Sequence, residues 1–404
     1  MNKLFIDDNI DFNNKNVLIR VDFNVPIDYE KNNITNYNRI NSTLPTIDYL
    51  IKKQTNNIII ITHLGRPKGK VVPELTLKLI KEYLEKKIKK QVHLLNLDDY
   101  LKNKNKFNNT ITLIENIRFH PEEERKSNEN EIKQFENKLS QLADIFVNDA
   151  FGACHRNHCS IMGKGYDLKL GGLLLKSELK NLKKVMNNVN KPFTCIIGGA
   201  KVHDKIKLIY NLIDKVDNII IGGGMVFTFL KVLYNMEIGD SLFDEEGSKY
   251  INDIMKKAKK KNVKIVLPEH FLCGDSFSNN AKTNLFTLQS GIASGYMGLD
   301  IGIKSIIKFE ECLTNSKTIL WNGPIGVFEF EKFSSGSKVL VDHIRKMTDK
   351  LEVDVVIGGG DTASCAQKFG LIGPCIHIST GGGATLTLLE GSEMPGIKTL
   401  NNIK

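Results

Sequence analysis

Short apolar runs that end in polar or glycine-rich turns recur along the whole chain. Helix-like stretches lie between them, as at residues 76–90 and 130–143. Buried strands that alternate with amphipathic helices predict a parallel sheet covered on both faces. The runs expected to be strands in the first half are Val17–Val21, Asn57–Ile61, Val92–Leu95, Ile111–Ile114 and Asp144–Val147.

The second half repeats the same alternation. Its expected strands are Phe193–Ile197, Asn218–Ile221, Val263–Leu267, Thr318–Trp321, Val353–Ile357 and Ile376–Ile378. Five or six strands in the first half and six in the second suffice for two separate sheets. The predicted fold class is therefore α/β, with two doubly wound, Rossmann-like domains of three αβα layers.

Residues 171–189 lie between the two sets of strands. Leu173, Leu179 and Val185 give this segment a partly apolar helical pattern, and Pro192 follows where a helix would stop. We expect a first domain at 1–170, an interdomain hinge helix at 171–189 and a second domain at 190–390. The alternative is one more crossover helix in a single large domain, but a length of 404 residues favours two.

Composition points to a soluble, cytoplasmic protein. Hydrophobic residues make up 41%, and no apolar run approaches the roughly 20 residues of a membrane span. The first residues lack the apolar stretch of a signal peptide. Seven cysteines show no regular framework, which favours reduced thiols. The net charge of +10 suits nucleic acid or a small anion, but lysine-rich segments such as 102–106 favour a general surface excess.

The predicted strands of the second half end in glycine. Glycine lets the backbone approach a ligand closely, and the amides of a following helix N-terminus face an anion. Four such turns predict a polyphosphate site. No G-x-x-x-x-G-K-[ST] or G-x-G-x-x-G motif is present, which argues against Walker-type NTPases and weakens a dinucleotide enzyme. The turns are Gly198–Gly199, Gly222–Gly224, Gly358–Gly360 and Gly381–Gly383.

Charged residues accompany these turns. Lys201 and Lys205 are four apart, so on a helix both would point from one face, and lysine suits a transferring phosphoryl group. Asp361 could hold Mg²⁺, which usually takes one or two carboxylates together with phosphate oxygens. A helix N-cap is the alternative for Asp361.

The predicted strand ends of the first half carry side-chain donors instead. Arginine recognises phosphate and carboxylate through two parallel hydrogen bonds. Asp22 and Asn24 could accept hydrogen bonds from a hydroxyl. The first half therefore predicts a basic crevice for a small anion with several charges. Its donors are Arg39, His63, Arg66, Arg118 and Arg156.

The segment Cys154–Cys159 invites a different interpretation. On a helix, Cys154 would pair with His158 and His155 with Cys159 at a spacing of four, as in a zinc site. Four ligands from about a turn and a half of helix close a tetrahedron poorly. We therefore expect hydrogen-bonded helical histidines beside Arg156 rather than a metal.

These residues together resemble the phosphoglycerate kinase family over essentially the whole chain. The matching stretches are Arg20–Pro26, Asn38–Ile40, His63–Pro67, Glu115–Phe119, Asn148–Gly152, His155–Arg156, Gly198–Val202, Gly222–Met225, Trp321–Pro324, Gly358–Thr362 and Ser379–Gly383.

The resemblance implies a role for particular residues. In the phosphoglycerate site it places Asp22, Phe23, Asn24, Arg39, His63, Leu64, Gly65, Arg66, Arg118 and Arg156. In the nucleotide site it places Lys201, Lys205, Gly222, Gly223, Gly298, Asn322, Pro324, Val327, Glu329, Gly359, Gly360, Asp361 and Thr362, with Asp361 as the Mg²⁺ ligand. The residues it implies for catalysis are Arg39, Lys201, Gly359 and Gly382.

The implied activity is reversible phosphoryl transfer between 1,3-bisphosphoglycerate and MgADP, giving 3-phosphoglycerate and MgATP. A carboxylate acceptor has no proton to lose at neutral pH, so we expect direct in-line transfer without a general base. Because the two halves would bind different substrates, we expect them to close about the hinge helix. The resemblance also implies a monomer and a C-terminal tail, 391–404, that returns to the first domain.

Two other classes of protein remain open. An NAD-dependent dehydrogenase could use the glycine turns, although the third glycine of its motif is missing. A basic nucleic-acid-binding module lacks the expected aromatic and basic patch, so we expect no nucleic-acid partner.

Overall fold

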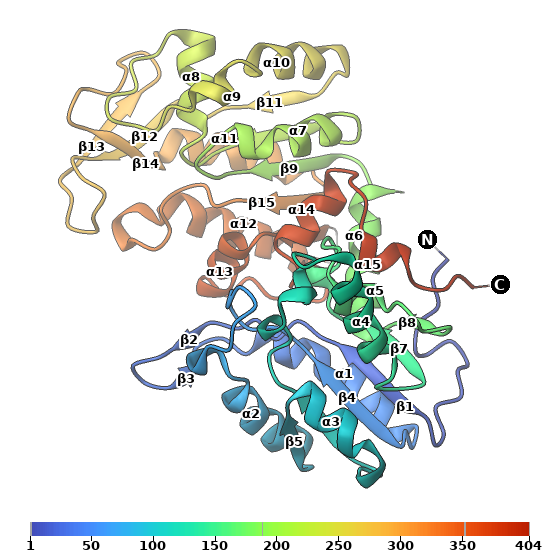
Figure 1. The fold of residues 1–404 in the computed structure, drawn as a ribbon. Helices are drawn as coiled ribbons and strands as arrows, with labels where there is room; N and C mark the ends of the chain where they lie inside the picture. The colour runs from blue at the N-terminus through green and yellow to red at the C-terminus, as the bar shows by residue number, and fades with distance from the viewer. Residues whose placement is uncertain (1, 188, 351–352, 404) are drawn as a thin grey trace. The chain divides into compact units, whose positions relative to one another are not determined.

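The computed structural model describes residues 2–187, 189–350 and 353–403. It divides into two compact units (Figure 1), Met1–Lys180 with Glu393–Lys404 and Asn181–Ser392. Each unit contains its own sheet of six parallel strands. The predicted fold class of two parallel-sheet α/β domains is confirmed.

The sheet of the first unit has the order β5-β6-β4-β1-β7-β8, and every neighbouring pair is parallel. Five of its strands match the predicted apolar runs. The sixth, β8, was not predicted because it has three residues, of which only Leu170 is a large apolar residue. The strands are β1 (Asn16–Arg20), β4 (Asn57–Ile61), β5 (Val92–Leu95), β6 (Ile111–Ile114), β7 (Ile145–Asn148) and β8 (Lys169–Gly171).

Helices bury both faces of this sheet. Successive side chains of each strand point to opposite faces, so neighbouring residues belong to different cores. Ile19 and Ile60 pack against helices α1 and α2 on one face. Leu18 and Ile59 pack against α3 and α4 on the other. The helices of the unit are α1 (Asn38–Lys52), α2 (Lys78–Ile88), α3 (Leu97–Asn103), α4 (Glu129–Ser140), α5 (Cys159–Met162), α15 (Pro395–Lys398) and the first part of α6 (Leu173–Met186).

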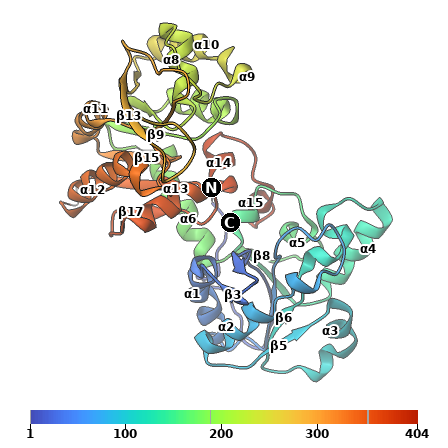
Figure 2. The same ribbon diagram turned by 90° about the vertical axis from the view of Figure 1, so that its left-hand side faces the viewer.

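The ends of the chain meet within the first unit (Figure 2). Lys3 and Asn402 form an antiparallel bridge, and the N–H of Leu4 donates to the carbonyl of Asn401 at 2.9 Å. The N–H of Gly396 donates to Cys154 at 2.9 Å. The C-terminal tail is thus held by backbone hydrogen bonds to this unit.

The sheet of the second unit has the order β11-β10-β9-β15-β16-β17 and is also entirely parallel. All six strands lie within the predicted runs to within one residue at each end. They are β9 (Phe193–Ile197), β10 (Asn218–Ile221), β11 (Lys264–Val266), β15 (Thr318–Asn322), β16 (Asp354–Gly358) and β17 (Ile376–Ile378).

Helices cover this sheet as well. Trp321 and Ile357 pack with α11, α12 and α13 into one core. Cys195 and Leu320, on the opposite face, are equally buried. The helices are α7 (Ile206–Ile213), α8 (Val226–Tyr234), α9 (Glu245–Ser248), α10 (Ile251–Lys260), α11 (Ile303–Thr314), α12 (Ser335–Asp349), α13 (Gly360–Lys368) and α14 (Gly383–Leu389).

Two small antiparallel sheets were not predicted. The larger, in the second unit, has the order β13-β12-β14, with β12 (His270–Gly274), β13 (Thr283–Thr287) and β14 (Met297–Ile301). The smaller is a hairpin of β2 (Ile27–Asp28) and β3 (Asn33–Ile34) in the first unit. Within the described residues, no helix combines the length and apolarity that crossing a bilayer requires.

Candidate functional site

The carboxyl ends of parallel strands share one edge of a sheet, and ligands bind beyond that edge. In the first unit the segments after β1, β4, β6 and β7 carry the predicted donors. The structure links these segments through hydrogen bonds and charge interactions. They bring together Asp22, Asn24, Arg39, His63, Gly65, Arg118 and Arg156 at one edge.

Arg39 lies in the first turn of α1 and reaches back to the segment after β1. Its Nη1 lies 3.2 Å from each carboxylate oxygen of Asp22 and 3.0 Å from the carbonyl of Asn24. The side-chain oxygen of Asn24 accepts from the N–H of Gly65 at 2.9 Å. Arg39 is thus positioned by the protein while a third of its side chain stays exposed.

Arg118 lies in the short 3₁₀ segment Ile117–Phe119 after β6. Its Nη1 donates to the carbonyl of Gly65 at 2.7 Å, and its Nε lies 3.3 Å from a carboxylate oxygen of Glu124. Burial, with Arg156 nearby, lowers the pKa of Arg118 to about 10. Burial and the neighbouring arginine destabilise the positive charge of Arg118, so an anion bound beside it would be favourable.

The remaining predicted residues differ in what they offer. Phe23 and Leu64 are buried in the hydrophobic core, so they shape the loops and offer no side-chain polar group. Arg66 is exposed and has no hydrogen bond or ion pair to any described residue. Arg156 lies beside His155, with 3.2 Å between its Nε and the ring Nε2.

Two residues at this edge were not predicted as site residues from the sequence. Asn116 is fully buried, accepts from the N–H of Leu64 at 3.2 Å and donates to its carbonyl at 2.7 Å, which joins the loops after β4 and β6. Arg20 ends β1 and is fully buried. A charged residue that ends an otherwise apolar run was the available signal, because buried arginines require partners.

The helix expected through Cys154–Cys159 is wrong. A 3₁₀ turn ends at Ala153, the N–H of Arg156 bonds to the carbonyl of Ala153, His158 is extended, and α5 begins only at Cys159. The four-residue helical spacing is therefore not formed. Among the described residues, no group of three or more His, Cys, Asp or Glu is arranged to hold a metal.

In the second unit, glycine loops pack directly on one another at the carboxyl edge. A Cβ on Gly198 would lie 2.1 Å from the carbonyl oxygen of Pro324, and one on Gly323, which has a φ of +101°, would lie 2.2 Å from the carbonyl oxygen of Gly198. The loops after β9 and β15 can approach this closely only without side chains. Gly222 and Gly223 lie in the adjoining loop after β10.

Lys205 lies beside the end of β15. Its Nζ donates to the side-chain oxygen of Asn322 at 2.6 Å, and burial lowers its pKa. Lys201 is exposed in the loop before the 3₁₀ turn η6 (His203–Lys205), and α7 starts only at Ile206. The expectation that both lysines share a helix face is therefore wrong.

The loop after β16 leads into α13. Gly359 is its N-cap with a φ of +97°, and the Thr362 hydroxyl accepts from the N–H of Gly323 at 2.7 Å. Asp361 lies in the first turn, is exposed, and has no hydrogen bond or ion pair to the described residues. Gly382, with a φ of +45°, precedes α14. Gly360 opens α13 and is exposed.

Beside these loops the second unit contains a cavity of about 620 Å³. This volume falls within the range of about 300–1,000 Å³ typical of small-molecule sites. Six of the predicted nucleotide residues line it, and Gly222, Lys201, Lys205, Asn322, Gly359, Gly360 and Thr362 do not. The six are Gly223, Gly298, Pro324, Val327, Glu329 and Asp361.

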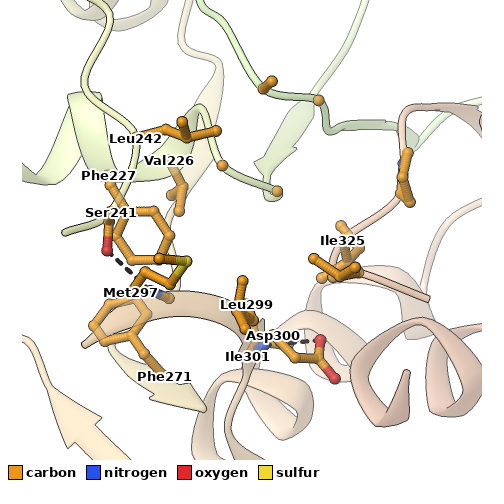
Figure 3. Close-up of a pocket in the computed structure, with 18 of the residues that line it drawn as sticks. Val226, Phe227, Ser241, Leu242, Phe271, Met297, Leu299, Asp300, Ile301 and Ile325 are labelled. Atoms are coloured by element: carbon orange, nitrogen blue, oxygen red, sulfur yellow. Dashed lines mark hydrogen bonds between the residues drawn. The ribbon is translucent and has the colours of Figure 1, made fainter. Parts of the chain in front are cut away.

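Much of the cavity wall is apolar and was missed from the sequence. Figure 3 shows Phe227, Phe271 and Met297 gathered at one side, with Phe227 and Phe271 ring centroids 5.6 Å apart. The Ser241 hydroxyl accepts from the N–H of Gly298 at 2.9 Å. These residues come from α8, the antiparallel sheet and the segment before α9. The pattern of parallel strands gave no sign of this sheet.

Comparison with known proteins decides the family. The model of the family described as "Phosphoglycerate kinase" matches residues 6–392. The chain belongs to the phosphoglycerate kinase family. It is therefore an enzyme, a kinase that has a carboxyl group as phosphoryl acceptor, and the resemblance predicted from the sequence is confirmed.

Curated relatives match over nearly their whole length. The chain is 47% identical to phosphoglycerate kinase of Plasmodium falciparum, with 99% of each chain covered, and 48% identical to that of Schizosaccharomyces pombe, again with 99% of each. Among solved structures, phosphoglycerate kinase from Coxiella burnetii is 36% identical, with a TM-score of 0.86 and 98% of each chain covered. The Pyrococcus horikoshii enzyme is 27% identical, with a TM-score of 0.78 and 98% of each chain covered.

An ion pair holds the loop that carries Lys201 and Lys205 in this member of the phosphoglycerate kinase family. The ring Nδ1 of His203 lies 3.0 Å from each carboxylate oxygen of Asp244, which also accepts from the His203 N–H at 2.8 Å. Asp244 in turn caps α9 through the N–H of Gly247. The side-chain hydrogen bond to Asp244, helped by Asp204 and Glu246, raises the pKa of His203.

The contribution of this pair to the stability of the fold should decrease as pH rises. A raised folded-state pKa means that the contribution is complete below the ordinary histidine pKa of about 6.5 and is lost as pH rises through the raised value. His203→Ala should therefore lower the melting temperature more at about pH 5.5 than at about pH 9. Melting curves of the parent and the variant at both pH values check this.

His203→Gln is the matched control, since it keeps a polar side chain without a titrating charge. Its deficit relative to the parent should also shrink at high pH. An equal deficit for His203→Ala at both pH values would show that packing, and not the charge of His203, connects it to Asp244.

Proposed function

We propose that the chain transfers a phosphoryl group reversibly between 1,3-bisphosphoglycerate and MgADP in glycolysis, giving 3-phosphoglycerate and MgATP. The observation that supports this most is the division of chemistry between the units. One sheet edge gathers guanidinium groups, and the other gathers glycine loops beside a cavity of about 620 Å³. A small anion with several charges suits the first edge, and a nucleotide suits the second.

The phosphoglycerate is assigned to the first domain, 1–170, together with the tail at 391–404. Arg39, Arg118 and Arg156 would hold its charged ends, and Asp22 and Asn24 would lie near its hydroxyl. Asp22 already accepts from Arg39, so a substrate hydroxyl would bond to an acceptor that the protein has fixed in place. His63, Gly65 and Arg66 would complete the site.

The nucleotide is assigned to the second domain, 190–390. The apolar wall of Phe227, Leu242 and Met297 suits a base, and Glu329, which also lines the cavity, would bind the ribose. Lys205 and the amides after β16 would face the phosphates. Pro324 and Val327 would flank the nucleotide.

Mg²⁺ fits the donors that the second unit offers. The Asp361 carboxylate lines the cavity and is not engaged by any described residue. No cluster of three potential ligands exists in the described part of the chain, which suits an ion held by one carboxylate and by phosphate oxygens. When bound, Mg²⁺ neutralises phosphate charge.

The proposed transfer is direct and in line. The acceptor carboxylate is ionised at neutral pH, so no side chain needs to remove a proton. Arg39 and Lys201, with the backbone N–H groups at Gly359 and Gly382, would stabilise charge on the migrating group. Two substrates on two units require the units to close, and we propose the helix at 171–189 as the hinge.

Two further expectations follow from the resemblance. We propose that the chain acts in the cytoplasm and as a monomer. No nucleic-acid partner is expected, because the sequence has no basic patch interleaved with aromatic residues. Gel filtration with light scattering tests the monomer.

A coupled assay tests the proposed function. Purified full-length protein should form ATP from 1,3-bisphosphoglycerate only when ADP and Mg²⁺ are both supplied. MgADP, and not NAD, should raise the melting temperature. Stabilisation by NAD without ATP formation would favour a dehydrogenase and contradict the proposal.

Replacement of Arg39 by alanine should lower kcat about 10²–10³-fold, as loss of a charge-stabilising donor does. The effect should fall on kcat more than on KM, because the contact strengthens in the transition state. Steady-state kinetics with both substrates varied measure this. Lys52→Ala, at the other end of α1, is the control, and an intact kcat in Arg39→Ala would show that the role is misassigned.

Replacement of Lys205 by alanine should weaken MgADP binding about 10- to 100-fold, the usual cost of losing a hydrogen bond from a charged group. Isothermal titration calorimetry of the full-length variant measures the Kd. Lys207→Ala, an exposed neighbour two residues along, should leave the Kd unchanged. Equal affinities for the parent and Lys205→Ala would remove Lys205 from the site.

A further inference from the structure

A buried arginine lies behind the basic edge of the first unit. Arg20 is fully buried, and a charge inside a protein is stable only with hydrogen-bonding partners. Its Nε donates to the Ser160 hydroxyl at 2.8 Å, and its Nη1 donates to the carbonyl of Val21. The Ser160 hydroxyl in turn donates to the buried carboxylate of Glu123, with an Oγ to Oε1 distance of 2.6 Å.

A third hydrogen bond of the Arg20 side chain is with His63, a residue assigned above to the phosphoglycerate site. The Nη2 of Arg20 lies 3.2 Å from the Nδ1 of His63. Arginine has only N–H donors and never accepts a hydrogen bond. The Nδ1 atom must therefore be the acceptor, so it carries a lone pair and no proton.

The charge on the ring follows from its surroundings. His63 is 3% exposed, and its charged neighbours are Arg20 on β1, Arg39 on α1, and Arg118 and Arg156. Asp22 is the nearby acid, but its carboxylate oxygen is 4.0 Å from Nδ1 and bonds to Arg39. Burial, and then these four arginines, hold the pKa of His63 well below its ordinary value. The ring is neutral at physiological pH.

We propose that Arg20 is a positioning residue that fixes His63 as the neutral tautomer with its proton on Nε2, so that this ring edge donates a hydrogen bond to the anionic substrate of the first unit. The identity of that substrate rests on the proposed function. The tautomer rests only on the contact with Arg20.

The free edge of the ring is consistent with this role. Nε2 has no hydrogen bond to the described residues, and it is not among their fully buried atoms that lack a partner. A neutral donor recognises an anion without adding a further cation to a group of four arginines. The donor also stays unchanged as pH falls from about 8 to about 5.5, a range in which an ordinary histidine becomes charged.

Nuclear magnetic resonance of the full-length protein with ¹⁵N-labelled histidine tests the inference directly. Long-range proton–nitrogen correlations should show His63 with an unprotonated Nδ1 and a protonated Nε2 throughout that pH range. The signal is assigned by its loss in His63→Gln. Addition of 3-phosphoglycerate should shift Nε2 and its proton more than Nδ1. A protonated Nδ1, or a cationic ring at neutral pH, would overturn the proposal.

Two variants separate positioning from general stability. Arg20→Lys keeps a donor towards Nδ1 and should keep the tautomer. Arg20→Met removes the donor and should give a mixture of tautomers, with KM for 3-phosphoglycerate raised about tenfold and a smaller change in kcat. Because Arg20→Met leaves Glu123 without its cation, a second variant with Glu123→Gln in addition protects the fold.

The tautomer measurement and the kinase assay test separate proposals, so either proposal can be contradicted while the other stands. An active kinase whose His63 is protonated on Nδ1 overturns the role of Arg20 and leaves the proposed function intact. The predicted tautomer without any response of Nε2 to 3-phosphoglycerate overturns the donor role.

Discussion

All strands in each of the two large sheets run in one direction, and this constraint arranges everything else at the candidate sites. Parallel pairing places the end of every strand at the same edge, so segments far apart in sequence meet there. In the first unit this brings the segments after β1, β4, β6 and β7 together. In the second it lets Gly198 pack on Gly323 at a distance that no side chain would permit.

The two edges solve the problem of anion recognition differently. Four arginines surround His63 in the first unit. Fewer acids balance them: Asp22 pairs with Arg39, Glu124 pairs with Arg118, and Glu123 lies near Arg20. Guanidinium groups that outnumber their acidic partners favour a bound anion, because the anion supplies the missing negative charge. The second unit relies on backbone amides and a few cations beside an apolar cavity, which suits a ligand with both a flat apolar part and a charged part.

Apolar runs were enough to predict eleven strands, because a strand covered on both faces is apolar throughout. Strands β12–β14 escaped because they form a small antiparallel sheet whose residues are partly exposed and partly polar. The apolar cavity wall, including Phe271 and Met297, was missed for the same reason. The charged and glycine-rich positions were predictable because their chemistry is unusual at the end of a buried strand.

Spacing alone misled in two places. Lys201 and Lys205 are four apart, yet Asp244 accepts from the N–H of His203 and the chain turns as a 3₁₀ segment there. Cys154 and His158 have the same spacing, but both lie in the non-helical segment between the 3₁₀ turn that ends at Ala153 and the helix α5 that begins at Cys159. In both cases a hydrogen bond or a turn determined the backbone conformation, and the spacing of residues in the sequence does not reveal either one. Local spacing also could not reveal the role of Arg20, because the proposed positioning of His63 depends on a hydrogen bond between residues 43 positions apart.

The central claim is that each unit binds one of the two substrates by itself. Hydrogen–deuterium exchange of the full-length protein, with one ligand added at a time, tests it most directly. The account predicts that 3-phosphoglycerate alone slows exchange in 20–24, 63–66 and 116–118, and that MgADP alone slows it in 198–205, 222–225 and 358–362. Protection of 198–205 by 3-phosphoglycerate alone, with no protection of 63–66, would contradict it.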